Sequence, residues 1–140
     1  MRGPSDLTYL LTRAERLLAR RLADILVAED CTPDAWRVVQ VLADGKGHFM
    51  TELSDLAFLP PGSLTRLVDQ LVEDNLVYRR GDDVDRRRIR VHLAARGRRL
   101  HDRVAERFRE RIDGLDIDEG LAPLLDEMIT ALDGTSVVRR

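Results

Sequence analysis

Apolar side chains recur along the first thirty residues at the spacing of an α-helix. They stand three or four positions apart, which places them on one face of a helix with about 3.6 residues per turn. These positions are Leu7, Leu10, Leu11, Ala14, Leu17, Leu18, Leu22 and Ile25. Ser5 or Asp6 is suited to cap the helix, because a short polar side chain accepts a hydrogen bond from the first turn. The pattern predicts a long first helix over about residues 5–30.

A second helix is predicted where Thr32 offers a cap and Pro33 takes the first helical position. Its inward positions are Trp36, Val39 and Leu42. Gly45 then ends the pattern, and the following "HFM" is long enough only for a stub of strand.

Two short helices follow with only a tight turn between them. Thr51 is suited to cap "ELSDLAFL", and two prolines precede Ser63 at the start of the next helix. The inward positions of that next helix are Leu64, Leu67, Val68 and Leu71. Asn75 stands where a left-handed helix ending is needed. Since neither helix is long enough to be stable alone, the pair predicts a helix-turn-helix.

The segment "VYRRGDDVDRRRIRVHL" contains two runs of alternating apolar and polar residues, separated by a charged turn. Val77 in the first run and Ile89, Val91 and Leu93 in the second are expected to point to one side and to anchor the segment to the core. The segment therefore predicts a β-hairpin with a polar tip.

Two further helices complete the pattern. From Ala95 to about Gly114 a narrow stripe consists of Leu100, Val104, Phe108 and Ile112. The last helix uses Leu121, Leu124, Leu125, Met128, Ile129 and Leu132. The first helix and these two are richer in leucine than one small domain can cover, which favours a homodimer.

Charge is distributed unevenly, although the net charge at pH 7 is only −2. Residues 1–76 carry 8 basic and 12 acidic side chains, residues 77–111 carry 13 and 6, and residues 112–140 carry 2 and 7. A basic block between acidic ones is typical of one surface that meets a polyanion. A solvated arginine-rich helix would give similar counts, so the placement of the arginines decides between the two.

The helix-turn-helix and the basic hairpin together suit the two grooves of DNA. The second helix of the pair can enter a major groove, and a thin hairpin tip can reach the minor groove beside it. On the face opposite its leucines this helix presents Pro61, Gly62, Ser63, Thr65, Arg66 and Gln70. Arginine near the first turn suits a guanine edge or a phosphate, and hydroxyls suit phosphates.

The hairpin tip combines one carboxylate with a run of arginines. Arg86 and Arg87 suit a narrow, electronegative minor groove. Asp85 facing phosphates would weaken binding, so we expect it to hold a neighbouring arginine in a bidentate ion pair. The alternative is a surface turn with an incidental pair, which contributes little to stability. Arg88 and Arg90 receive no role from the sequence.

The segment "PPGSLTRLVDQLVEDNLVYRRGDDVDRRRIRVHLAARG" resembles the winged-helix region of the MarR (multiple antibiotic resistance regulator) family. The resemblance rests on the Leu-Thr-Arg of the recognition helix, the Asp-x-Arg of the wing, and the valine, leucine and glycine that follow; the order of six helices matches throughout. It implies a mainly α (α+β) fold with six helices and a β-hairpin wing. Ala94 replaces a usual threonine cap and Asn75 a usual glycine.

The resemblance also implies a homodimeric transcriptional regulator, usually a repressor, that binds double-stranded DNA at a pseudo-palindromic operator. Residues 1–140 would form one unit, with dimerisation helices at about 5–30 and 95–134 around a winged helix-turn-helix lobe at about 32–94. Its recognition helix would place Ser63, Thr65 and Arg66 in the major groove, with Arg86 and Arg87 on the wing.

Members of the family commonly respond to small aromatic acids bound between the dimer helices and the DNA-binding lobe, which implies a small-molecule effector here. The residues suited to line such a pocket are Tyr9, Arg13, Arg16 and Trp36, because aromatic rings stack on the ligand and arginines hold its carboxylate. The alternative is that Trp36 belongs to the core and that the arginines form a solvated face.

Other classes of function find less support in the sequence. Cys31, the one cysteine, offers a thiol-responsive regulator, although an ordinary small residue beside a helix cap suits its position better. No metal or cofactor is expected, because His48, His92 and His101 lack a metal-ligand spacing. No enzymatic constellation is recognisable either. With no signal peptide or membrane span we expect a cytoplasmic protein. A winged-helix protein-interaction module without DNA binding is the remaining alternative.

Overall fold

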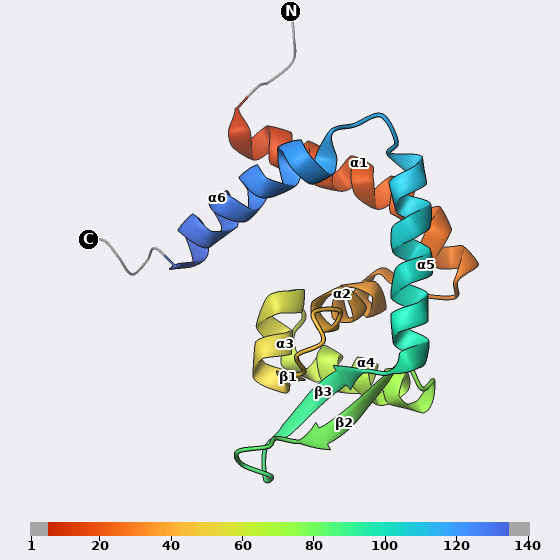
Figure 1. Cartoon of the computed structure of the whole chain (residues 1–140), viewed down its shortest axis with the longest axis vertical. Coiled ribbons are helices and arrows are strands. Elements are labelled where there is room, and N and C mark those ends of the chain that lie inside the picture. The colour runs from red at the N-terminus through yellow and green to blue at the C-terminus, as the bar shows by residue number, and fades with distance from the viewer. Residues whose placement is uncertain (1–5, 135–140) are drawn as a thin grey trace, which may run out of the picture.

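The structure is a computed structural model that describes residues 6–134. Its elements are α1 (Leu7–Ala28), α2 (Pro33–Leu42), β1 (His48–Phe49), α3 (Met50–Ala57), α4 (Pro61–Glu73), β2 (Val77–Gly81), β3 (Ile89–Leu93), α5 (Ala95–Arg111), a π-helical turn η1 (Ile117–Leu121) and α6 (Ala122–Gly134). In Figure 1, α2, α3, α4 and the strands form a lobe, from which α5 rises to meet α1. The predicted fold class, six helices with a β-hairpin wing, is confirmed over the described residues.

The three strands form one small antiparallel sheet in the order β1-β3-β2. β2 and β3 make the predicted hairpin, with Val77 opposite Leu93 at its base and Gly81 opposite Ile89 toward its tip. On the other side of β3, His48 of β1 faces Val91. Because β1 leads directly into α3, this sheet connects the hairpin, or wing, to the helix-turn-helix.

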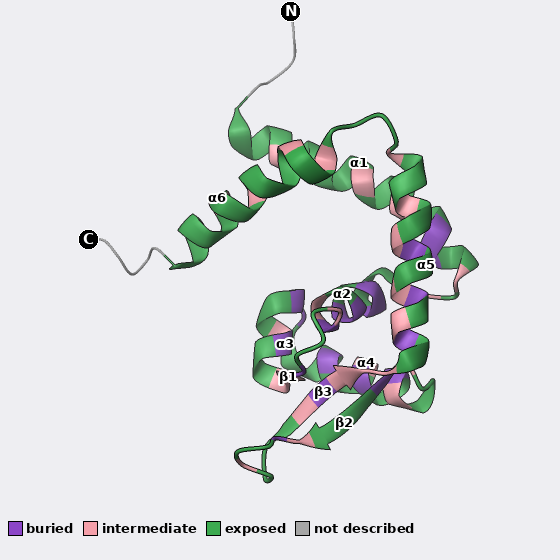
Figure 2. Ribbon diagram, in the orientation of Figure 1, coloured by how far each residue is buried: buried purple, intermediate pink, exposed green. Residues whose placement is uncertain are grey.

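The core of the lobe lies between α2, α3, α4 and one face of the sheet. Its buried members are Ala35, Val38, Leu42, Leu53, Ala57, Leu59, Leu64, Val68, Leu71, Val77 and Val91. Figure 2 shows these buried positions gathered inside the lobe. Burying one valine or leucine side chain contributes about 1.5–3 kcal/mol. The shared core therefore holds α4 and the base of the wing in one body.

The helix-turn-helix turn is closed by backbone contacts. Phe58 ends α3 with a positive φ of 57°, and its side chain is 84% exposed. The amide of Leu59 donates to the carbonyl of Ser54 at 3.0 Å, which satisfies the end of α3. Pro60 and Pro61 then start α4 at once, because proline cannot continue α3 but suits a first helical position.

A second core cluster joins the lobe to α1 and α5. Its buried members are Ile25, Leu26, Trp36, Val39, Leu100 and Val104. The start of α5 packs closely on the lobe, because a Cβ at Gly97 would lie 2.1 Å from the carbonyl oxygen of Leu76. Arg98 adds a hydrogen bond of 2.9 Å from its Nη2 to the carbonyl of Ala43 at the end of α2. The close approach of α5 to Leu76 thus requires a glycine at position 97.

α6 contrasts with the other helices because none of its residues is buried. In Figure 1 it overlaps α1 in the view and runs outward to the left, away from α5. Large apolar side chains on α1, after α5 and on α6 remain exposed within residues 6–134: Leu7, Leu10, Leu17, Leu115, Leu121, Leu124, Ile129 and Leu132.

Two local predictions are wrong. Thr51 does not cap α3; Phe49 occupies that position, because the carboxylate of Glu52 reaches back to accept the Phe49 amide at 3.0 Å. Ile89 does not anchor the wing to the core: it is 43% exposed, since the hairpin extends beyond the lobe at that point.

The other caps agree with their predictions. Asp6 caps α1 by accepting the Tyr9 amide at 2.9 Å, and Thr32 caps α2 by accepting the Ala35 amide at 3.1 Å. Ser5, the alternative cap, lies outside the described residues. Asn75 has the predicted left-handed geometry, with φ of 61°.

Candidate nucleic-acid interface

The recognition-helix residues predicted from the sequence share one solvent-facing side of α4. Leu64, Val68 and Leu71 are buried against the lobe, so the opposite side carries the exposed predicted set: Pro61, Gly62, Ser63, Thr65, Arg66 and Gln70. The packing of three apolar residues thus determines which polar residues face outward.

The start of α4 leaves donors available to an acceptor outside the protein. Pro60 provides no side-chain cap, so the first amides of the helix, at Gly62 and Ser63, have no partner within it. A Cβ added at Gly62 would meet no atom within 4 Å. The Thr65 hydroxyl donates to the carbonyl of Pro61 at 3.0 Å, which leaves its lone pairs free to accept. This bare, donor-rich end suits close approach to a phosphate backbone.

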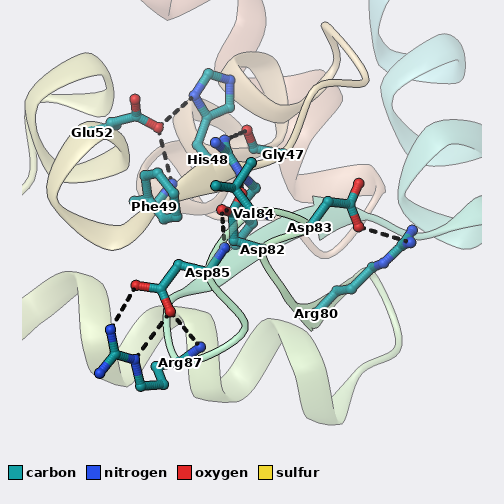
Figure 3. A network of polar contacts seen from close by, with 11 residues as sticks. Gly47, His48, Phe49, Glu52, Arg80, Asp82, Asp83, Val84, Asp85 and Arg87 are labelled. Carbon is teal, nitrogen blue, oxygen red and sulfur yellow. Dashed lines mark hydrogen bonds and ion pairs between the residues drawn. The ribbon is translucent and has the colours of Figure 1, made fainter.

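The wing tip is ordered by its own carboxylates, as Figure 3 shows. The Asp85 carboxylate accepts the Arg87 Nε at 3.1 Å and Nη2 at 3.4 Å, which is the predicted bidentate pair. It also accepts the Arg87 amide at 3.1 Å. These bonds from Arg87 hold the pKa of Asp85 below its ordinary value. The Arg87 side chain remains 90% exposed, so Asp85 directs it without covering it.

Three arginines on α4 and at the wing tip carry exposed positive charge without a carboxylate partner. Arg79 pairs with Asp69, and Arg80 with Asp83 at 3.5 Å. Among the described residues Arg66, Arg86 and Arg88 form no ion pair; these three are all exposed. Unpaired positive charge is therefore available to a polyanion where the predicted contacts lie.

The four residues proposed for an effector pocket do not come together. Tyr9, Arg13 and Arg16 line a shallow groove of about 240 Å³ on the outer face of α1. Trp36 lines a separate groove of about 980 Å³ between α1, α2, α5 and η1. The periodicity of α1 is consistent with two separate grooves. Tyr9 and Arg13 follow Leu7 and Leu11 of the predicted apolar stripe by two positions, which places them on the opposite face of the helix.

Trp36 is both a core residue and a wall of the larger groove. Its side chain is 5% exposed and stacks on His101, with ring centroids 5.5 Å apart and planes at 16°. Within the described residues its buried indole Nε1 has no hydrogen-bond partner. An unpaired buried donor costs roughly 1–3 kcal/mol, so the buried position of Trp36 is stabilised by packing and not by a hydrogen bond from its indole.

Cys31 does not have the surroundings of a reactive thiol. Burial, and then the negative charges of Glu29 and Asp30, raise its pKa to about 11. Its Sγ lies 3.5 Å from the carbonyl of Thr32, to which it donates. Since the thiolate is the reactive form, this environment opposes the thiol-responsive alternative.

Over the described residues, no group of three or more potential ligand side chains is arranged to hold a metal ion. None of the helices described here is long and apolar enough to cross a membrane.

Comparisons with known proteins find similar transcriptional regulators. The model of the MarR family matches residues 29–88, which span α2 to the wing tip. The transcriptional regulator FarR of Neisseria gonorrhoeae is 27% identical over 106 residues, covering 76% of this chain and 73% of that protein. The homoprotocatechuate degradative operon repressor of Escherichia coli is 25% identical over 130 residues, covering 89% of this chain and 88% of the relative.

A solved structure extends the likeness to the whole fold. NadR, crystallised with 4-hydroxyphenylacetate, superposes with a TM-score of 0.82 and covers 96% of this chain and 97% of its own, at 24% identity. The matched region contains both elements that the sequence predicts to face DNA, α4 and the wing tip, and the shared fold includes α1, α5 and α6. The chain is therefore similar to the MarR family of winged-helix transcriptional regulators, in sequence over residues 29–88 and in fold over nearly its whole length.

Proposed function

We propose that this protein is a homodimeric repressor of transcription that binds double-stranded DNA in the cytoplasm, with α4 in the major groove and the wing tip in the neighbouring minor groove. The observation that carries the proposal is that arginines without carboxylate partners, Arg66 and Arg86, and the directed Arg87 all project from one lobe. Guanidinium groups suit both guanine edges and a narrow minor groove.

DNA binding is tested by measuring affinity for promoter fragments recovered from genomic DNA, at several salt concentrations. Replacing Arg87 with alanine should weaken binding to all fragments and lower the salt slope by about 1, because one phosphate contact is lost. Replacing Arg66 with alanine should also change which fragments are preferred. Arg37→Ala is the matched control, because that arginine on α2 already pairs with Asp34 at 3.4 Å.

A salt-independent affinity, or equal losses for the Arg37, Arg66 and Arg87 variants, would contradict this assignment of the probes. Failure of every genomic fragment to bind would instead favour a protein-interaction module.

We assign the uncovered surface of α1 and α6 to a second copy of the chain. The exposed apolar residues there are accompanied by complementary charge: α6 carries Asp126, Glu127 and Asp133, and the outer face of α1 carries Arg13, Arg16 and Arg20. Sedimentation equilibrium should give a dimer for the native chain and a monomer for Leu132→Glu. The control Thr130→Glu, at an exposed polar position of the same helix, should remain a dimer. A native monomer would contradict the proposal.

We propose that a small aromatic acid bound in the Trp36 groove releases the DNA. The groove is lined by a stacked pair of rings, Trp36 and His101, and by Arg109 of α5, a residue type that can pair with a carboxylate. Trp36 is the one tryptophan of the chain, so its fluorescence reports occupancy directly.

Titration with small aromatic acids should change that fluorescence at the concentrations that release DNA. Arg16→Ala, in the outer groove of α1, should leave both responses unchanged. Loss of the response in Arg16→Ala with an undisturbed Trp36 signal would place the effector in the outer groove instead.

A further inference from the structure

Four side chains near the tip end of the wing strands form a cluster that we call the wing clamp: Phe49, Asp82, Arg88 and Arg90. Arg90 donates from Nε to Asp82 Oδ1 at 2.7 Å and from Nη1 to the carbonyl of Gly47 at 3.1 Å. The guanidinium carbons of Arg90 and Arg88 lie 4.0 Å and 3.7 Å from the centre of the Phe49 ring. The two arginines that had no role in the sequence thus meet at one aromatic ring.

Asp82 connects this cluster to the backbone of the wing tip. Its Oδ2 accepts the amides of Val84 at 3.2 Å and Asp85 at 3.0 Å, while its Oδ1 accepts Arg90. The side chain of Asp82 is only 11% exposed, and the bond from Arg90 is the first cause that lowers its pKa. One carboxylate therefore joins Arg90 to the loop that contains Asp85, and Asp85 in turn directs Arg87.

The other end of the clamp reaches the helix-turn-helix. Phe49 immediately precedes α3, and its amide donates to Glu52 in the first turn of that helix. Next to it, the ring of His48 lies between Asp44 and Glu52, with Nε2 2.8 Å from Asp44 Oδ2 and Nδ1 3.5 Å from Glu52 Oε1. Figure 3 shows His48 and Phe49 with their contacts to Glu52 at the start of α3.

Apolar packing does not hold the wing tip. Val84 is 94% exposed and Ile89 is 43% exposed, so neither secures the loop to the core. Instead, polar contacts and the stacking of Arg88 and Arg90 on Phe49 hold the wing tip. Guanidinium groups are suited to this task, because one planar side chain can form directed hydrogen bonds and stack at the same time.

We infer that Arg90 is a positioning residue for DNA binding: through Asp82 and Phe49 it fixes the wing tip relative to α3 and α4, so that both probes meet DNA together. The inference rests on the proposed function. Its physical basis is that a hairpin ordered before binding does not lose conformational freedom during binding. Arg90 itself does not touch DNA, since its Nε and Nη1 are already engaged and its side chain is 31% exposed.

Arg90→Lys tests this inference, because lysine keeps the charge but cannot reproduce the planar, two-directional contact. Arg80→Lys is the matched control: Arg80 stands directly opposite Arg90 in the hairpin and has only a 3.5 Å pair with exposed Asp83. Phe49→Leu removes the stacking ring while keeping an apolar side chain. Melting curves establish that each variant is folded.

The first measurement is amide hydrogen exchange at Val84 and Asp85 in the DNA-free protein. Exchange should be faster in Arg90→Lys and in Phe49→Leu and unchanged in Arg80→Lys, because these two amides are held by Asp82. Unchanged exchange in Arg90→Lys would overturn the inference whatever the DNA result.

The second measurement is DNA affinity in a double-mutant cycle with Arg87→Ala. Arg90→Lys alone should weaken binding about tenfold, and it should add little in the Arg87→Ala background, because it acts through the wing tip. Additive losses would identify Arg90 as an independent DNA contact and overturn the inference alone. Absence of binding by the native protein would overturn the proposed function, while the exchange result would still decide whether the clamp orders the tip.

Discussion

Gly97 is the residue at which the junction between the DNA-binding lobe and α5 is most sensitive to a single methyl group. An alanine Cβ there would lie 2.1 Å from the carbonyl oxygen of Leu76 and 2.6 Å from Cδ1 of Leu93. The leucine tip can rotate away. The carbonyl cannot, because it is held by the amide of Ala94 at 2.9 Å. Relief therefore requires α5 to move away from the lobe by about 1 Å to reach an ordinary contact distance.

The expected cost of Gly97→Ala follows from these distances. Overpacking of this kind costs typically 1–3 kcal/mol, and weakening the Leu76 to Ala94 hydrogen bond costs about another 1 kcal/mol. The better helix propensity of alanine offsets about 1 kcal/mol. A net loss of about 1–3 kcal/mol of unfolding free energy should lower Tm by roughly 4–12 °C in a chain of this size.

Thermal melting followed by circular dichroism measures the change, with Gly134→Ala as control. Gly134 lies in α6, and a Cβ there would meet no atom within 4 Å. The control should melt at the native temperature or slightly above it. If Gly97→Ala melts within about 2 °C of the native protein, α5 can shift at little cost, and the close approach to Leu76 does not hold the junction together.

Three further predictions concern single side chains. Gly62→Ala should raise the unfolding free energy by about 0.5 kcal/mol, because a Cβ there meets no atom within 4 Å, yet weaken DNA binding; stronger or equal binding would show that the start of α4 does not approach DNA. Cys31, with its pKa raised to about 11 by burial, should react with iodoacetamide at neutral pH at least about tenfold more slowly in the folded than in the unfolded chain; equal rates would show that the thiol is not protected. Burial first, then the charges of Arg80 and Arg90, lower the pKa of His92 below its ordinary 6.5. Stability that depends on its neutral form should therefore be lost as the pH falls below about 6.5, and His92→Gln should melt with a shallower pH dependence; an unchanged slope would exclude His92 as the source.

Periodicity predicted the parts of the fold that depend on one helix or one strand at a time. The spacing of Leu64 and Val68 predicts which face of α4 is polar, because these two apolar side chains must both point into the core. Asn75 follows the last turn of α4, where a left-handed helix ending is expected, and its φ of 61° confirms that expectation. The pair between Asp85 and Arg87 was also accessible, since the two residues are neighbours along the wing.

What the sequence missed depends on contacts between elements. Asp82 and Arg90 are eight positions apart, and Arg90 and Gly47 are forty-three apart, so nothing in the local pattern joins them. The wing clamp could not be predicted from the sequence, because it depends on the pairing of β1 with β3. Tyr9 and Trp36 are residue types that suit one aromatic pocket, but the helical phase of α1 puts Tyr9 on its far side, so the two residues line separate grooves.

Because β3 leads directly into α5, the wing is connected to the helices outside the DNA-binding lobe. Leu93 ends β3 and Ala95 begins α5, whose start is held to the lobe at Gly97. Six residues after Gly97, Arg103 forms a two-oxygen pair with Glu29 at 3.0–3.3 Å, joining α5 to the end of α1. The Trp36 groove lies between these same helices.

An acid bound in that groove can change DNA affinity only as far as it binds one placement of α5 better than another. A tenfold preference shifts the equilibrium by about 1.4 kcal/mol, which is comparable to the cost expected for the added methyl at Gly97.

Because the joint at Gly97 resists separation of α5 from the lobe, a shift of α5 has to move the base of the wing with it. The wing tip, fixed to α3 by the Arg90 clamp, would then move against α4 only by straining that clamp. Release of DNA by this route requires the clamp to be intact: in Arg90→Lys the ligand should still bind Trp36, but it should lose its effect on the wing-dependent part of the affinity.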